Sequence, residues 1–139
     1  MTRWFRAGAF GLLVVSVLHT VGYFNRTLQD PAALALDSAM DAYHYHILGL
    51  HPSASDIAAS LGLAMSILLF LIGVLDLVVS TALTHDLRAL RRAAWVNVFG
   101  AGVLAAMFGY YRILPPCITL AMVMLLFLAA TTRPASRRF

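Results

Sequence analysis

The side chains that could bind a metal ion lie mainly in one stretch, "DAYHYHILGLHP", residues 41–52. This stretch holds three of the five histidines, and another histidine lies upstream in an apolar run. Neutral imidazole and carboxylate groups are ligands for Zn, Fe or Cu, and three or four of them suffice for a structural or catalytic ion. The candidate metal ligands are therefore His19, His44, His46, His51 and Asp41.

The spacing of these histidines leaves other interpretations open. In the order H-x-H, His44 and His46 lie on the same side of an extended chain but on different sides of a helix. The surrounding apolar pattern is helical, which argues against a shared ligand position. Haem ligation by His19 and His46 is a further alternative. The sequence itself requires no cofactor, so metal and haem are hypotheses.

A second candidate site combines Asp76 and Asn97, two polar residues within long apolar runs. An ionisable residue inside a membrane-spanning helix is often functional, so Asp76 could carry a proton or a cation. The alternative is structural. Asp76 is expected about 9 Å inside the end of its helix, at 1.5 Å per residue, and Asn97 at a similar depth. A hydrogen bond between them would then join two helices.

Composition indicates that these residues belong to a membrane protein. The 139 residues are 61% hydrophobic and 12% charged, with a mean hydropathy of +0.83, whereas soluble domains are about 25% charged. A membrane-spanning helix needs about 20 mainly apolar residues. We therefore predict one all-α, polytopic domain over residues 1–139, whose four transmembrane helices form an antiparallel bundle. The predicted spans are residues 6–24, 57–82, 93–112 and 115–132.

The basic residues, all arginines, predict the orientation of these spans. One side of the membrane would receive Arg3, Arg6, Arg88, Arg91, Arg92, Arg133, Arg137 and Arg138, and the other side Arg26 and Arg112. By the positive-inside rule both termini face the cytoplasm, and the His-rich segment faces the periplasm across a bacterial inner membrane. Arginines at membrane edges are expected to meet anionic lipids. The net charge of +4 therefore indicates lipid contact rather than nucleic-acid binding.

The segment 25–56 between the first two spans predicts an amphipathic outer helix over residues 31–48. Asp30 is a good N-cap and Pro31 suits the first helical position, and Gly49 can end the helix. Such a helix lies at the membrane surface or caps the bundle. Whether it rests on the membrane or dips into it is left open.

Further local patterns position the helices. Ser53 and Asp56 form a predicted capping box at the start of the second span, and Tyr43 lies on the apolar side of the outer helix. No clear cleavage site follows the first apolar run, so we expect residues 1–24 to stay as an uncleaved span. Small residues form two stripes that should face other helices. These are Gly8, Gly11, Val15, His19, Gly22 and Arg26 in the first span, and Gly62, Ser66, Gly73, Asp76 and Ser80 in the second.

Two runs carry a resemblance to a known family. They are "SDIAASLGLAMSILLFLIG", residues 55–73, and "YYRILPPCITLAMVMLLFLA", residues 110–129. Together they resemble a family of small bacterial integral membrane proteins of unknown function. In that family a polar residue leads into a Gly-containing second helix, and Tyr and Pro-Pro introduce the last helix. The resemblance implies a four-helix membrane fold, and it brings neither an activity nor a functional residue.

Three functions fit these patterns. We favour a non-enzymatic membrane subunit or a lipid- or hydrophobic-ligand-binding module, which could also contact a membrane protein partner or a second copy of itself. The alternatives are a metal- or haem-dependent redox enzyme that uses the outer histidines, and a proton- or ion-coupled carrier centred on Asp76. No nucleophile, phosphate-loop or zinc-protease motif occurs, so no catalytic residue is predicted. The candidate residues for ligand or partner contact are His19, Asp76, Asn97 and Tyr43.

Overall fold

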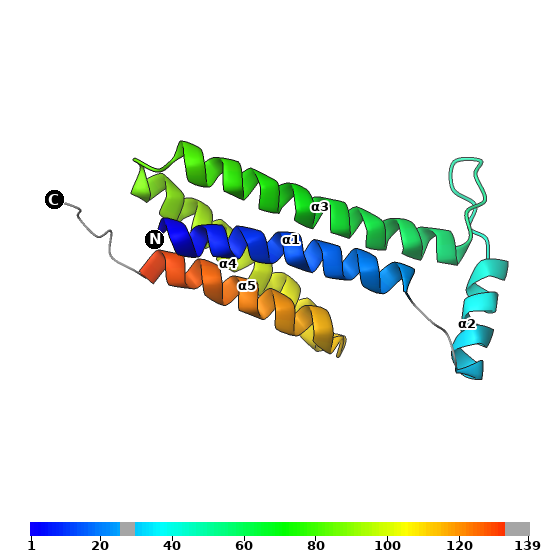
Figure 1. Cartoon of the computed structure of the whole chain (residues 1–139). Coiled ribbons are helices and arrows are strands. Elements are labelled where there is room, and N and C mark those ends of the chain that lie inside the picture. The colour runs from blue at the N-terminus through cyan, green and yellow to red at the C-terminus, as the bar shows by residue number, and fades with distance from the viewer. Residues whose placement is uncertain (26–29, 133–139) are drawn as a thin grey trace.

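The computed structural model of the chain describes residues 1–25 and 30–132, and Figure 1 shows their arrangement. Within these ranges it contains five helices: α1 (Thr2–Phe24), α2 (Pro31–Ala42), α3 (Ala54–Ala82), α4 (Leu87–Tyr110) and α5 (Leu114–Thr132). All except α2 are long and apolar enough to cross a membrane. The prediction of an all-α fold with four long apolar helices is therefore confirmed for the described residues. Arg26, Arg133, Arg137 and Arg138 lie outside the described residues.

Helix α1 lies between two neighbours, since it packs against α3 on one side and α5 on the other. Helix α4 packs against α5, and α2 contacts α3. The start of α1 and the end of α5 lie at the same end of the molecule, and α2 lies at the far end (Figure 1). The two ends of the bundle therefore carry different groups of side chains, which are described separately below.

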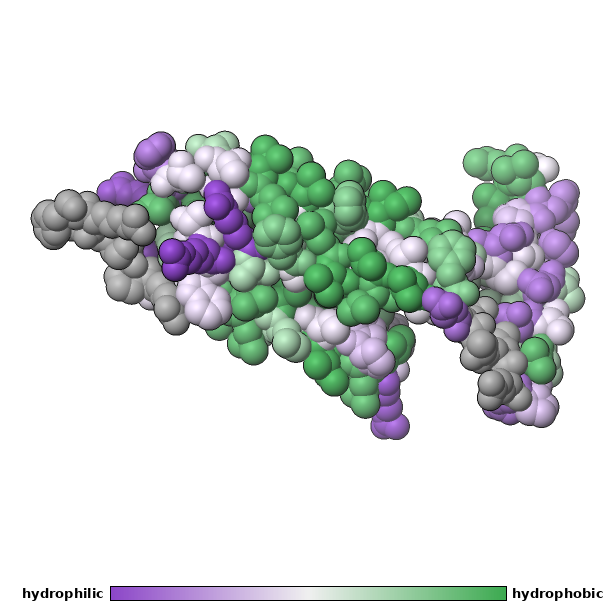
Figure 2. Space-filling model, in the orientation of Figure 1, coloured by the Kyte–Doolittle hydropathy of each residue, from purple (hydrophilic) through white to green (hydrophobic). Residues whose placement is uncertain are grey.

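The buried core of the bundle contains side chains from α1, α3, α4 and α5. Phe5 and Phe127 are fully buried and their rings meet edge to face, with centroids 5.3 Å apart. Leu90 on α4, Leu120 on α5 and Leu69 on α3 belong to the same buried cluster. Large apolar side chains cover the outside of the bundle, and hydrophilic side chains gather at its two ends (Figure 2). This distribution suits helices that contact lipid along their length.

The predicted small-residue stripes do mark contacts between helices. A Cβ atom at Gly8 would lie 2.9 Å from the ring of Phe127, and one at Gly73 would lie 3.0 Å from the backbone oxygen of Ala9. Gly22 is the exception, because a Cβ there would meet nothing within 4 Å. At this end α1 continues past the hairpin of α4 and α5 (Figure 1), so the prediction for Gly22 is wrong.

The predicted outer helix is too long, because α2 ends at Ala42 and residues 43–53 fold back as a hairpin. The amide of Tyr45 donates to the carbonyl of Pro52 at 3.0 Å. At the tip, Leu48 and Gly49 have φ of 51° and 81°, the backbone of a two-residue hairpin turn. The aromatic residues of this segment favour an extended chain. Gly49 therefore forms the turn and does not end a helix.

Both predicted helix starts are confirmed. The Asp30 carboxylate accepts the amide of Ala32 at 3.1 Å, with Pro31 in the first turn of α2. Ser53 and Asp56 form the reciprocal capping box of α3, with both hydrogen bonds at 3.1 Å. These contacts satisfy amides that have no partner within their own helix. They determine where α2 and α3 begin and hence the edges of the cleft described next.

Candidate functional site

A cleft of about 460 Å³ opens where the end of α1, the helix α2 and the start of α3 come together. Its wall on α3 consists of the small residues Ala58, Ala59 and Gly62, which leave room beside the helix. Polar and larger side chains line the rest of the cleft. They are His19, Tyr23, Asp37, Met40, Asp41, Ser55 and Asp56.

Local hydrogen bonds hold α2 against α3 at this cleft. Asp37 and Asp41 are one helical turn apart on α2 and therefore share a face. The Ser55 hydroxyl donates to the carboxylate of Asp41, which links the end of α2 to the start of α3. Ser55 also lies 2.9 Å from the hydroxyl of Ser53, the residue that caps α3. The cap of α3 and the docking of α2 are thus parts of one polar network.

The lining of the cleft is acidic. It carries the carboxylates of Asp37, Asp41 and Asp56 and the imidazole of His19, with no arginine or lysine among its described lining residues. A carboxylate offers about four acceptor positions, so the hydrogen bonds that Asp41 and Asp56 accept from Ser55 and Ser53 leave acceptor capacity toward the cleft. A cationic or hydrogen-bond-donating group is therefore the natural complement of this surface.

The candidate metal ligands are distributed over two places. His19 and Asp41 lie at the cleft, whereas His44, His46 and His51 lie in the exposed hairpin. Nδ1 of His44 donates to the backbone oxygen of His51 at 2.9 Å, and the rings of His46 and His51 meet edge to face at 4.5 Å. Among the residues that the structure describes, no three His, Cys, Asp or Glu side chains are grouped to hold a metal ion.

Tyr43 is an exposed residue at the junction of α2 and the hairpin. Its ring meets the ring of Tyr45 edge to face, with centroids 5.0 Å apart. Tyr43 is not part of the cleft lining. The structure therefore places this candidate contact residue on the outer surface, apart from His19.

Asp76 and Asn97 lie far from the cleft and contact each other. Nδ2 of Asn97 donates to the Asp76 carboxylate at 2.8 Å, which joins α4 to α3 and confirms the predicted hydrogen bond. Asp76 is only 8% exposed. One turn further along α3, Nε of Arg6 donates to the hydroxyl of Ser80 at 3.0 Å. This polar layer connects three helices, which favours the structural interpretation of Asp76 over a carrier function.

Sequence reasoning missed two of the contacts between helices. Besides the pair of Arg6 and Ser80, the hydroxyl of Ser16 donates to the backbone oxygen of Ser66 at 2.8 Å, between α1 and α3. Ser66 and Ser80 belong to the predicted small-residue stripe, and this was the available signal. Their partners on α1 could not be assigned without the packing of α1 against α3.

We expect Asn97→Leu to lower the free energy of unfolding by about 1 to 2 kcal/mol. The substitution leaves the buried Asp76 carboxyl group without its donor, and hydrogen bonds between membrane helices contribute about 0.6 to 1.7 kcal/mol. Unfolding by sodium dodecyl sulfate in mixed micelles, followed by circular dichroism, measures the effect. Asp76→Leu and the double variant complete the cycle, and additive effects of the two single changes would contradict the coupling.

Comparison with protein-family models, with curated proteins and with solved structures found no match for this chain. The resemblance to small bacterial membrane proteins therefore stays a prediction. The site residues form an acidic, partly apolar cleft at one end of a bundle of apolar helices.

Proposed function

We propose that this chain is a non-enzymatic integral membrane protein whose four long helices form an antiparallel transmembrane bundle. The apolar length of each helix and the apolar surface around the bundle support this placement (Figure 2). The arginine groups support an orientation with both termini in the cytoplasm of a bacterial cell. The cleft and the hairpin of residues 43–53 then lie on the outer side of the inner membrane.

In this placement the protein binds an amphiphilic ligand at the outer cleft. The observation that carries the proposal is the combination, in about 460 Å³, of three carboxylates and an imidazole with the apolar wall of α3. The polar headgroup of the ligand contacts Asp41, Asp56 and His19, and its tail passes Met40 and Ala59 toward the bilayer. Ligand sites commonly combine an apolar lining with a few placed polar groups in this way.

The charge of the lining selects the class of headgroup. A cationic headgroup gains from the carboxylates, whereas an anionic headgroup would be repelled by them. An exposed ion pair contributes up to about 1 kcal/mol. Two ion pairs between the headgroup and the cleft carboxylates would therefore raise the affinity for a cationic ligand about tenfold or more. The expected ligand is therefore a long-chain molecule with an ammonium or similar donor group.

A fluorescent alkylammonium probe should bind the purified chain in lipid nanodiscs about tenfold more tightly than an alkylsulfonate probe of the same chain length. The variant Asp41→Asn should weaken this preference, because it removes a carboxylate of α2 that lines the cleft. Fluorescence titration measures both affinities. Equal affinity of the two probes for the unaltered chain would contradict the proposed ligand class.

A pair of tryptophan substitutions on α3 provides the matched control. Ala59 lines the cleft, so Ala59→Trp fills it and should abolish saturable binding of the alkylammonium probe. Ala64 is exposed on the same helix and does not line the cleft, so Ala64→Trp should bind the probe as the unaltered chain does. Saturable binding to the Ala59→Trp chain would place the ligand elsewhere.

A further inference from the structure

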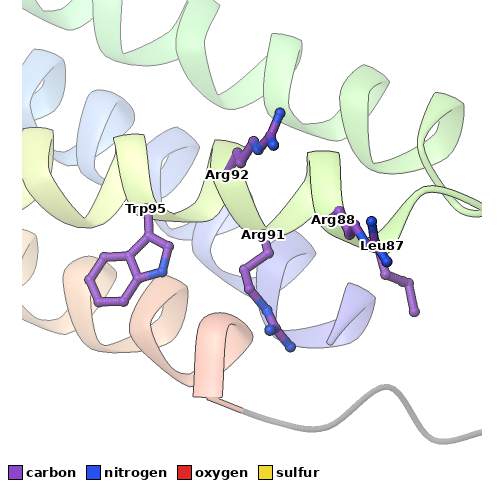
Figure 3. A pocket seen from close by; sticks show the side chains of 5 residues that line it. All are labelled: Leu87, Arg88, Arg91, Arg92 and Trp95. Atoms are coloured by element: carbon purple, nitrogen blue, oxygen red, sulfur yellow. The ribbon is translucent and has the colours of Figure 1, made fainter.

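A second pocket lies on α4 at the opposite end of the bundle from the cleft. Its volume is about 410 Å³, and all of its lining residues belong to the first turns of α4. Figure 3 shows them, with Arg91 and Trp95 projecting to the same side of the helix. The lining consists of Leu87, Arg88, Arg91, Arg92 and Trp95.

The positive charge of this pocket is not neutralised by the described part of the chain. The nearest acid in the sequence, Asp86, caps α4 by accepting the amides of Arg88 and Ala89 at 3.1 and 2.9 Å. Within residues 1–25 and 30–132, the three arginines make no side-chain hydrogen bond or ion pair. Their guanidinium groups therefore remain available to an anionic ligand.

The same face of α4 becomes apolar as it leaves the pocket. At the helical spacing of three or four residues, Arg88 and Arg91 are followed by Trp95, Phe99 and Val103. Trp95 is 52% exposed and Phe99 is 76% exposed. The opposite face of α4 is buried through Leu90, Ala94, Ala101 and Ala105. Along this exposed stripe the arginines come first, the indole of Trp95 follows, and the last side chains are purely apolar. At 1.5 Å per residue, Arg88 and Trp95 are about 10 Å apart along the helix axis.

We propose that this stripe binds an anionic phospholipid of the inner leaflet. Arg88 and Arg91 contact the phosphate, because guanidinium groups bind phosphate oxygens in a bidentate manner. Trp95 lies at the level of the glycerol, where tryptophan is enriched in membrane proteins, and an acyl chain lies along Phe99. The apolar continuation favours a lipid over a soluble anion, which would gain nothing from Phe99. This site rests on the transmembrane placement proposed above.

Quenching of Trp95 fluorescence by brominated lipids tests this site directly. The chain has two tryptophans, so Trp4→Phe leaves Trp95 as the only reporter. This variant is reconstituted in phosphatidylcholine that contains increasing fractions of lipid with brominated acyl chains, either phosphatidylglycerol or phosphatidylcholine. Half-maximal quenching should need a fraction of brominated phosphatidylglycerol that is about 25-fold lower than that of brominated phosphatidylcholine, since Arg88 and Arg91 each contribute about fivefold.

Charge-removing variants separate the site from general attraction to the membrane. Arg88→Gln with Arg91→Gln should bring the preference for phosphatidylglycerol close to one, and Arg91→Gln alone should reduce it about fivefold. Arg112→Gln removes the same charge from an exposed position at the end of α4 away from the pocket and should leave the preference unchanged. Circular dichroism confirms that each variant keeps its helices.

The possible results distinguish this site from the transmembrane placement. Equal quenching by the two brominated lipids, or a preference that persists without Arg88 and Arg91, overturns the lipid site and leaves the placement standing. Loss of the preference on addition of inorganic phosphate assigns the arginines to a soluble anion and also overturns it. Absence of quenching by either lipid overturns both the site and the placement.

Discussion

Gly73→Leu is expected to lower the free energy of unfolding by about 3 kcal/mol, at the upper end for an overpacked core position. A Cβ at Gly73 would lie 2.8 Å from Cδ2 of Leu13 and 3.0 Å from the backbone oxygen of Ala9. The leucine side chain could rotate, but the oxygen belongs to the backbone of α1 and moves only with the helix. The two helices would have to separate along their contact.

The matched control for this change is Gly100→Leu. Gly100 is also a helical glycine, on α4, and a Cβ there would meet nothing within 4 Å. Leucine favours a helix over glycine by up to about 1 kcal/mol, so this variant should be neutral or slightly more stable than the unaltered chain. Unfolding in mixed micelles by sodium dodecyl sulfate measures both variants. A similar loss of stability in both would show that close packing of α1 on α3 is not the cause.

The second large effect is expected for Phe127→Ala, which should lower the free energy of unfolding by about 3 kcal/mol. Phe127 is fully buried and packs against Phe5 and Gly8 of α1. In a membrane the unfolded helices remain in lipid, so the transfer of apolar surface from water contributes little. The loss arises instead from the cavity and from the dispersion contacts of the ring, which lipid cannot replace inside the bundle.

Leu125→Ala tests whether burial determines this effect. Leu125 is on the same helix as Phe127 but is 57% exposed, and substitutions at exposed positions usually change stability by less than about 0.5 kcal/mol. The same unfolding measurement in mixed micelles compares the two variants. An equal loss in both would indicate that α5 is stabilised by its surface rather than by its contact with α1.

The four long apolar helices and the N-terminal caps of α2 and α3 were predictable because the signals for them are local. An apolar run of about 20 residues specifies a span without reference to any other part of the chain. The cap of α2 by Asp30 and the capping box of α3 follow from residues at most three positions apart. The contact of Asp76 with Asn97 was predictable for a related reason. Burying a polar group in an apolar medium is unfavourable unless the group is hydrogen-bonded, so two polar side chains at similar depth are expected to bind each other.

The hairpin of residues 43–53 was not predictable with the rules used for helices. The apolar spacing up to Met40 continues formally through Tyr43 and Ile47, so a helical pattern extends across the true end of α2. The spacing of His44 and His46 suits an extended chain equally well. The backbone hydrogen bonds of the hairpin, which join Tyr45 to Pro52 and Ile47 to Leu50, show that the segment is extended and not helical.

The sequence by itself determined that this protein has four long apolar helices, that α3 begins after the cap residue Ser53, and which helix faces carry small and polar residues. The tertiary structure alone decided that α1 packs between α3 and α5, that α2 docks on α3 through Asp41 and Ser55, and that an acidic cleft results. The physical reason is the range of the interactions. Helix formation depends on residues within a turn or two of each other, whereas a cleft depends on side chains from separate helices, whose relative positions only packing specifies.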